Sequence, residues 1–427
     1  MTEPCDLTAV EARRRIDRGD LTADALVRSC LDRIAAREPE VEAWEHLDRA
    51  AALAAARQAD SGQGGGTLRG LPFAAKDVIE TADMPTTYGS PIYAGHRTAW
   101  DAACVAMARN AGGILIGKTV TAEFAHRAPG KTRNPWNPGH TPGGSSSGSA
   151  AAVACGMVPL AMGTQTGGSV IRPAAYCGVV GYKGSFGEFC LFGVREQTRS
   201  FDTLGLFGRT VADVALFRSG LLGEAPVPLA AVDGAALRIG LCRTMFWDQA
   251  EPAVQALIED CARRLEAAGA TVTDFTLPPV FRELKESSRW ISAWEMPRAF
   301  AYEIANHRDK ISKDMLEGRV ADGANCTYDL YVGGLEKQRE AQRSLLDAMK
   351  DIDVLITPST PGEAPEGLAS TGTSLFNAFW TEAGVPTISL PAGRGPKQLP
   401  LGVQLVGHRH RDRALLEAAA WAAGVLA

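Results

Sequence analysis

The chain has 427 residues, of which 45% are hydrophobic and 22% are charged, a composition typical of a globular protein with a large core. The net charge of −5 comes without any block of basic residues, so nucleic acid is not an expected partner. No run of about 18 apolar residues occurs, and the N-terminus is charged where a signal peptide needs an apolar core. We therefore expect no membrane segment and a cytoplasmic location.

The spacing of the cysteines and histidines indicates whether disulfide bonds or metal sites are expected. The nine cysteines form no CxxC pair and no Cys/His cluster, which disfavours both a disulfide framework and a structural zinc site. The histidines lack the H-x-x-x-H spacing of many metallohydrolases. The sequence thus predicts neither a metal nor a cofactor.

The sequence of the N-terminal part predicts helices and a strand that pack against the rest of the fold. Residues 8–20 and 22–37 have the capping residues and the apolar period of two amphipathic helices. A strand near 41–47 and an alanine-rich helix through Ala59 follow, and then the glycine-rich segment 61–66. That segment is too short to separate two domains.

Residues 70–79, GLPFAAKDVI, predict an apolar strand that carries one lysine, Lys76. One interpretation is an ion pair with the adjacent Asp77. The other is a catalytic base, because burial disfavours the ammonium form and lowers the lysine pKa. The strand itself does not decide between them.

Two serine-glycine clusters follow a helix at 101–110, a buried strand at 114–117 and a proline-rich irregular segment at 133–142. The first cluster, GGSSSGS at 143–149, precedes the alanine-rich run 150–155, so its serines are expected at a helix N-terminus. The second, GTQTGGS at 163–169, follows the apolar residues 158–162, a predicted strand. We expect the glycines to end that strand and to form a loop, with a new helix starting near Ser169. Free N–H groups on such a loop suit an oxyanion hole, which makes Ser169 the better-placed nucleophile.

These motifs resemble the amidase signature family of serine hydrolases. The two serines are 24 residues apart (169 − 145 = 24), and residues 70–77 match the family's G-x-P-x-x-x-K-D element. The resemblance implies that Ser169 is the nucleophile, that Ser145 is a bridging serine entered through a cis peptide, and that Lys76 is the base. It also leads us to expect an oxyanion hole at Thr166, Gly167 and Gly168, and substrate contacts at Gly143, Gly144 and Arg172.

The resemblance covers nearly the whole chain and implies one α/β/α domain over residues 1–427, with its signature core at about 70–210. A strand–helix–strand pattern at 237–241, 251–268 and 271–277 agrees with a large mixed or parallel sheet covered by helices on both faces. The match is weakest in the helical segment 280–350. Its aromatic residues are interpreted either as core or as the wall of the acyl pocket.

Two positions bear on the substrate. Gln165 stands where many family members have aspartate, a version that resembles the malonamidase-like branch, and Gly184 stands where proline is usual. Arg172, three residues after Ser169, either bonds groups of the fold or clamps a substrate carboxylate with its guanidinium fork.

The expected activity is hydrolysis of a small-molecule amide through an acyl-enzyme, in a homodimer. Carbamates, esters or ureas could serve as substrates on the same residues, and a related amidotransferase subunit would instead supply ammonia to partner subunits. A non-catalytic scaffold is disfavoured because Lys76, Ser145 and Ser169 are all present. An α/β-hydrolase elbow at 144–148 is disfavoured because prolines replace the required preceding strand, and only His307, His408 and His410 follow it.

Overall fold

The computed structural model describes residues 3–62 and 65–427, so Gln63 and Gly64 of the glycine-rich segment lie outside the described residues. The first half contains α1 (Ala9–Arg18), α2 (Ala23–Val41), β1 (Trp44–Leu47), α3 (Arg49–Asp60), β2 (Pro72–Lys76), α4 (Ala103–Asn110), β3 (Ile114–Thr119), α5 (Ser147–Ala154), β4 (Leu160–Gln165), α6 (Ile171–Cys177), β5 (Val180–Lys183), β6 (Thr203–Gly208) and α7 (Val211–Leu222). The second half contains β7 (Arg238–Leu241), α8 (Pro252–Ala267), β8 (Thr271–Asp274), α9 (Leu284–Ala299), α10 (Ala301–Asn306), α11 (Lys313–Met315), α12 (Ala321–Gly323), α13 (Tyr328–Ala348), β9 (Val354–Pro358), α14 (Ala378–Glu382), β10 (Thr387–Arg394), β11 (Pro400–Val406) and α15 (Asp412–Leu426).

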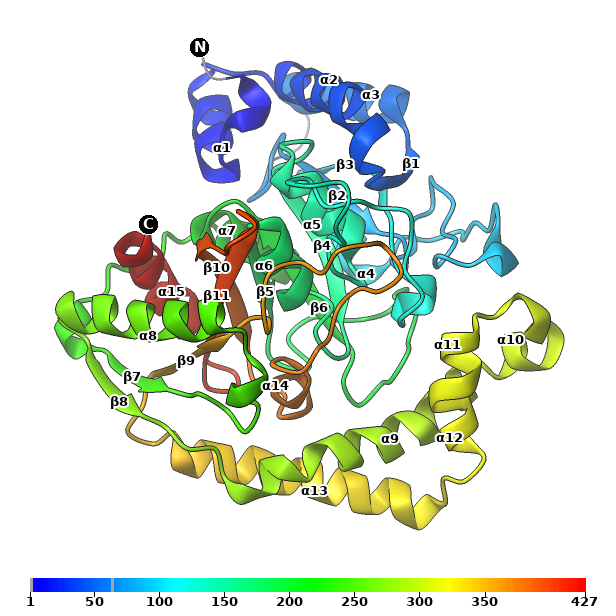
Figure 1. The fold of residues 1–427 in the computed structure, drawn as a ribbon. Coiled ribbons are helices and arrows are strands. Elements are labelled where there is room, and N and C mark those ends of the chain that lie inside the picture. The colour runs from blue at the N-terminus through cyan, green and yellow to red at the C-terminus, as the bar shows by residue number, and fades with distance from the viewer. Residues whose placement is uncertain (1–2, 63–64) are drawn as a thin grey trace.

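One sheet of 11 strands organises these elements, in the order β1-β3-β2-β4-β6-β5-β10-β11-β9-β7-β8 (Figure 1). The pairs of β2 with β3 and β4, and of β7 with β8 and β9, are parallel. The central pairs from β4 through β6, β5, β10 and β11 to β9 are antiparallel. The mixed α/β architecture predicted from the sequence is therefore confirmed.

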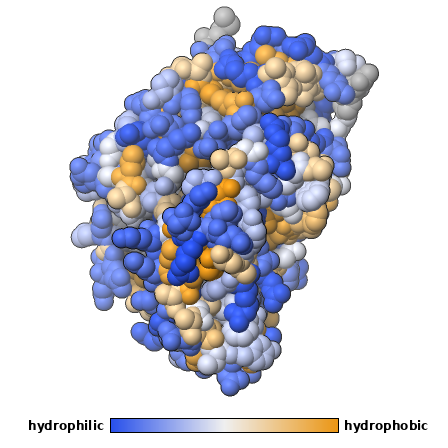
Figure 2. Space-filling view, turned by 90° about the vertical axis from the view of Figure 1, so that its right-hand side faces the viewer, coloured by the Kyte–Doolittle hydropathy of each residue, from blue (hydrophilic) through white to orange (hydrophobic). Residues whose placement is uncertain are grey.

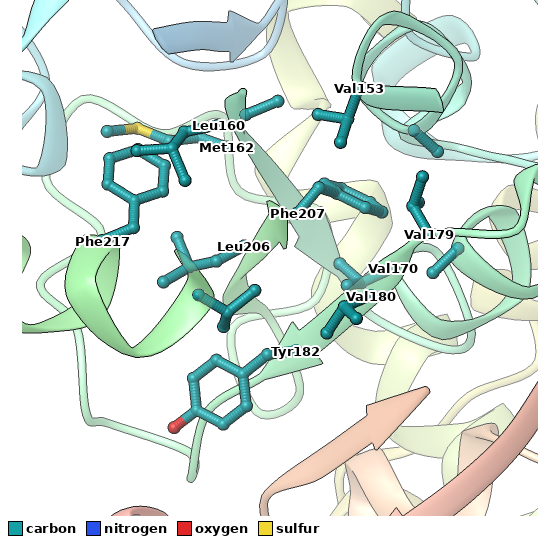
Figure 3. Packing of buried hydrophobic residues seen from close by; sticks show 14 of the residues in the cluster. Val153, Leu160, Met162, Val170, Val179, Val180, Tyr182, Leu206, Phe207 and Phe217 are labelled. Carbon is teal, nitrogen blue, oxygen red and sulfur yellow. The ribbon is translucent and has the colours of Figure 1, made fainter. Parts of the chain in front are cut away.

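Buried side chains pack on both faces of the sheet around β4, β5 and β6. Figure 3 shows Phe207 beside Val153 and Val170 on one face, and Leu206 beside Phe217 of α7 on the other. These side chains are all essentially inaccessible to solvent. This packed centre holds the two serine-glycine clusters on rigid elements.

The predicted end of the strand at residue 162 is wrong, because β4 continues through Gly163, Thr164 and Gln165. Gly163 is opposite Gly205 of β6 in the register. A Cβ atom at Gly163 would lie 2.7 Å from Phe207 and 2.7 Å from the Ser146 Oγ. Glycine is needed here for close packing of the start of α5 against the strand, and it does not end the strand.

The segment 280–350 is helical as predicted. Its longest helices, α9 and α13, run side by side at the bottom of Figure 1 and lead to α10, α11 and α12. Figure 2 shows the side of the molecule that carries α10, where most of the surface is hydrophilic and hydrophobic residues form small scattered patches. Within residues 3–62 and 65–427, no helix has the length and apolar character to span a membrane.

Candidate active site

Lys76 is the last residue of β2 and is completely buried. Its Nζ donates to the Ser145 Oγ at 2.7 Å and to the Thr164 Oγ1 at 2.7 Å, and it lies 3.5 Å from the Thr164 carbonyl oxygen. Among the described residues, no carboxylate lies within ion-pair distance of this amine. The lysine therefore contacts hydroxyl and carbonyl oxygens and no counterion.

The interpretation of Lys76 as an ion-pair partner of Asp77 is wrong. Asp77 Oδ1 instead pairs at 3.1 Å with Nζ of Lys118, a buried lysine on β3. The other oxygen of Asp77 accepts from the backbone N–H and the hydroxyl of Thr87. Asp77 lies in the turn directly after β2, so its carboxylate and the Lys76 amine at the end of the strand have different partners.

The electrostatics around Lys76 favour its neutral form. Burial lowers the pKa of Lys76 well below its usual value, and the positive charge of Arg172 acts in the same direction. The carboxyl of Asp202 opposes this shift. Burial raises the pKa of Asp202 itself to about 7, against hydrogen bonds from the Thr166 hydroxyl and from two backbone N–H groups. A neutral buried amine can accept a proton.

The first serine-glycine cluster is fixed between α5 and β4. The Gly144–Ser145 peptide bond is cis, as the family resemblance implies. The next residue, Ser146, donates its backbone N–H to the Ser169 carbonyl at 3.3 Å. Its hydroxyl bonds both the carbonyl and the N–H of Thr164. Ser146 thereby fixes the two clusters relative to each other, on either side of Lys76.

The second cluster forms a loop from Thr166 to Val170, and α6 begins at Ile171, two residues later than expected. The Gln165 Oε1 accepts from the N–H groups of Val170 and Ile171, and its Nε2 donates to Thr381. Within the described residues, the N–H groups of Gly167, Gly168 and Ser169 donate no hydrogen bond. Gln165 thus holds the end of the loop, whose N–H groups at Gly167, Gly168 and Ser169 donate to no described residue.

This loop borders a cavity of about 630 Å³. Thr166, Gly167, Gly168, Ser169 and Arg172 line it. Lys76 and Ser145 are not among its lining residues and are completely buried. Gly143 and Gly144, which we expected to contact substrate, also lie outside the lining of this cavity. Of the two predicted catalytic serines, Ser169 is therefore the one that lines the cavity.

Arg172 is buried, with 5% of its surface exposed. Its Nη2 donates to the Gly144 carbonyl at 2.6 Å and to the Thr371 hydroxyl at 3.1 Å. Burial lowers the pKa of Arg172 to about 10. The guanidinium thus holds the backbone directly before Ser145 while it also borders the cavity.

The helical segment 280–350 contributes to the cavity wall, but not through its aromatic residues. The residues it provides are Ser288, Ser292, Met296, Asp314 and Arg319. Trp294 instead stacks on Tyr331, and both belong to a separate packed cluster with Phe201 and Ile291. Trp294 and Tyr331 therefore have the predicted packing role, whereas the segment lines the pocket through residues other than its aromatic ones.

Sequence reasoning missed several groups of this site. The Thr164 hydroxyl accepts a hydrogen bond from Lys76, and the Asp202 carboxyl accepts one from the Thr166 hydroxyl. Glu382 of α14 is a buried acid in the cavity lining. Asp202 and Glu382 each interrupt an apolar stretch, FDTL and FWTEAG, which is the one signal that the sequence offers. None of the three histidines named for an α/β-hydrolase triad, His307, His408 and His410, lines this cavity, and His408 Nε2 lies 2.7 Å from the Ile352 carbonyl.

Comparison with known proteins identifies the family. The family model described as Amidase matches residues 25–416. The A subunit of glutamyl-tRNA(Gln) amidotransferase from Chloroflexus aggregans is 35% identical, with 97% of this chain and 96% of the relative covered. Its counterpart from Acidothermus cellulolyticus is 34% identical, with 96% and 94% covered.

Comparison with solved structures leads to the same family. A crystal structure described as an amidase superposes with a TM-score of 0.90 at 29% identity, covering 99% of this chain and all of that one. Native peptide amidase from Stenotrophomonas maltophilia gives a TM-score of 0.85 at 28% identity, with 99% and 97% covered. The chain belongs to the amidase family. It is accordingly an amide-hydrolysing enzyme with a single-domain α/β fold.

Proposed function

We propose that the protein hydrolyses a carboxylic acid amide through an acyl-enzyme formed on Ser169, with Ser145 and Lys76 as the proton-transfer pair. The observation that carries this proposal is the buried Lys76 amine, 2.7 Å from the Ser145 Oγ and without a carboxylate partner among the described residues. A lysine so placed has a lowered pKa and can act as a base at neutral pH.

In the first step, the Ser169 Oγ forms a bond to the substrate carbonyl carbon while its proton passes through the Ser145 hydroxyl to Lys76. A serine hydroxyl can relay a proton because it is both donor and acceptor. In this proposal the N–H groups of Gly167, Gly168 and Ser169, which donate to no described residue, bind the oxygen that becomes negative. Return of the proton through Ser145 to the nitrogen then breaks the C–N bond and releases ammonia or an amine.

In the second step, a water molecule hydrolyses the acyl-enzyme. The same lysine and serine take a proton from the water as it attacks the acyl-Ser169 ester, and the proton returns to the Ser169 Oγ as the acid leaves. The cavity over Ser169 accommodates both the acyl group and the water. Carbamates, ureas and esters could react by the same steps.

The second candidate function is that of an amidotransferase component, which is favoured by the names and the full-length coverage of the relatives. In that role the chain would release ammonia productively only with partner subunits. The test is ammonia release by the purified chain from a panel of small amides without ATP. Turnover supports a self-sufficient amidase, and activity that requires ATP and added subunits supports the amidotransferase role.

A homodimeric state, a cytoplasmic location and the absence of a nucleic-acid partner stay predictions. The nine cysteines are free thiols and seven of them are buried, which is compatible with a reducing compartment. Light scattering of the purified chain measures the oligomeric state directly.

A further inference from the structure

Glu382, at the end of α14, is an acid that the proposed hydrolysis does not use. It lines the cavity over Ser169, and only 2% of its surface is exposed. Its Oε1 accepts one hydrogen bond, from the Ser287 hydroxyl at 2.6 Å. Among the described residues, no lysine, arginine or histidine pairs with this carboxyl, and Oε2 accepts no hydrogen bond from the protein.

A buried carboxylate without a cation is unfavourable because desolvation disfavours the ionised form, so such a group stays protonated unless a ligand supplies a cation. Burial raises the pKa of Glu382 to about 8, with the Ser287 hydrogen bond opposing the shift. The other titratable residues of the cavity lining are His126, Arg127, Arg172, Asp314 and Arg319. None of them shifts the pKa of Glu382, whereas Arg127 acts on both Arg172 and Arg319. No arginine of the lining pairs with Glu382, so the described part of the cavity wall gives this carboxyl no counterion.

The surroundings of Glu382 define what could bind there. Ser288 and Ser292 of α9 also line the cavity and add hydroxyl groups to its wall. Met296 and Phe201 provide apolar surface suited to methylene groups. The preceding residue, Thr381, bonds the Gly167 carbonyl, which connects this wall directly to the loop that carries Ser169.

We propose that Glu382 is a specificity residue that binds a primary ammonium group on the acyl part of the substrate. This inference rests on the proposed function and deepens it by naming a substrate class, ω-amino acid amides. The ammonium would supply the missing cation, bonding Glu382 Oε2 and the serine hydroxyls.

The test compares two amides of equal length, 5-aminopentanamide and hexanamide, which differ by an ammonium in place of a methyl group. The wild-type enzyme should prefer the amino compound in kcat/KM, mainly through KM, and Glu382→Gln should reduce that ratio roughly tenfold to a hundredfold. The preference should also rise with pH as Glu382 ionises, and the Gln variant should lose this rise. Asp314→Asn serves as the control, since Asp314 is exposed and its charge is screened, so this variant should change the ratio much less.

An unchanged ratio in a folded Glu382→Gln protein would overturn the inference. If that variant does not fold, inhibition of the wild type decides: pentylammonium should inhibit more strongly than pentanoate, increasingly so from pH 6.5 to 8.5, and the opposite order overturns the proposal. Failure of the proposed function is distinct, because then neither amide is hydrolysed by any of the proteins.

Discussion

Replacement of Thr164 by valine tests how the structure sets the protonation of Lys76. The substitution nearly keeps the volume of the side chain but removes the Oγ1 that accepts from Lys76 Nζ at 2.7 Å. The Ser145 Oγ at 2.7 Å and the Thr164 carbonyl at 3.5 Å remain as acceptors. Because acceptors stabilise the ammonium form more than the neutral amine, their loss lowers the pKa of Lys76 further.

The size of the pKa shift follows from the free energy of the hydrogen bond that is lost. A bond to a charged group contributes about 1.5–3 kcal/mol, and one pKa unit corresponds to about 1.4 kcal/mol. The acidic limb of kcat/KM, where the neutral base appears as pH rises, should therefore move about one to two units toward lower pH in Thr164→Val. The plateau rate should fall by about tenfold, because one fewer group orients the amine.

The assay is kcat/KM on a neutral amide from pH 5 to 10. Thr203→Val is the matched control, since this buried threonine on the adjacent strand β6 donates to the Phe201 carbonyl and does not contact Lys76. Its profile should keep the wild-type midpoint, and thermal unfolding checks that both variants are folded. An acidic limb that stays in place or moves to higher pH in Thr164→Val would refute the reasoning.

Three further predictions concern the other groups of the site. Ser169→Ala should abolish turnover because no acyl-enzyme can form, whereas Ser145→Ala should keep residual turnover at a rate about 10²–10⁴-fold lower, and the reverse order would exchange their roles. Lys76→Ala should lose more activity at neutral pH on amides than on activated esters, since ester leaving groups need less protonation; equal losses measured on both would remove the acid role. Arg172→Lys should lower kcat/KM for neutral amides and for monoamides of dicarboxylic acids together, by about tenfold, because the bond to the Gly144 carbonyl is weakened. A loss confined to the dicarboxylic substrates would show instead that Arg172 clamps a carboxylate.

Local patterns in the sequence predicted most of the elements and the residues of the proposed catalytic set. Thr8 caps α1 through the Glu11 N–H, and Thr210 forms a capping box with Asp213 at α7, because capping depends on residues three positions apart. Short motifs predicted Lys76, Ser145 and Ser169, because the residue types and their spacing in this chain match those of the amidase signature family.

The missed features depend on contacts between distant residues. Lys76 and Thr164 are 88 positions apart, and Ser287 and Glu382 are 95 apart, so neither pair leaves a local pattern. Adjacency suggested the wrong partner for Asp77, which lies in the turn after β2 and pairs with Lys118 of β3. Gly163 was misjudged because its place in β4 is set by the packing of Ser146 and Phe207.

The central claim, that Ser169 is the acylated residue and is activated by Lys76 through Ser145, is tested most directly by covalent labelling. The purified protein is treated with a fluorophosphonate, and the modified peptide is located by mass spectrometry. We predict one label, on Ser169, formed much more slowly in Lys76→Ala and absent in Ser169→Ala. A label on Ser145, or labelling of Ser169 at an equal rate without Lys76, would contradict the account.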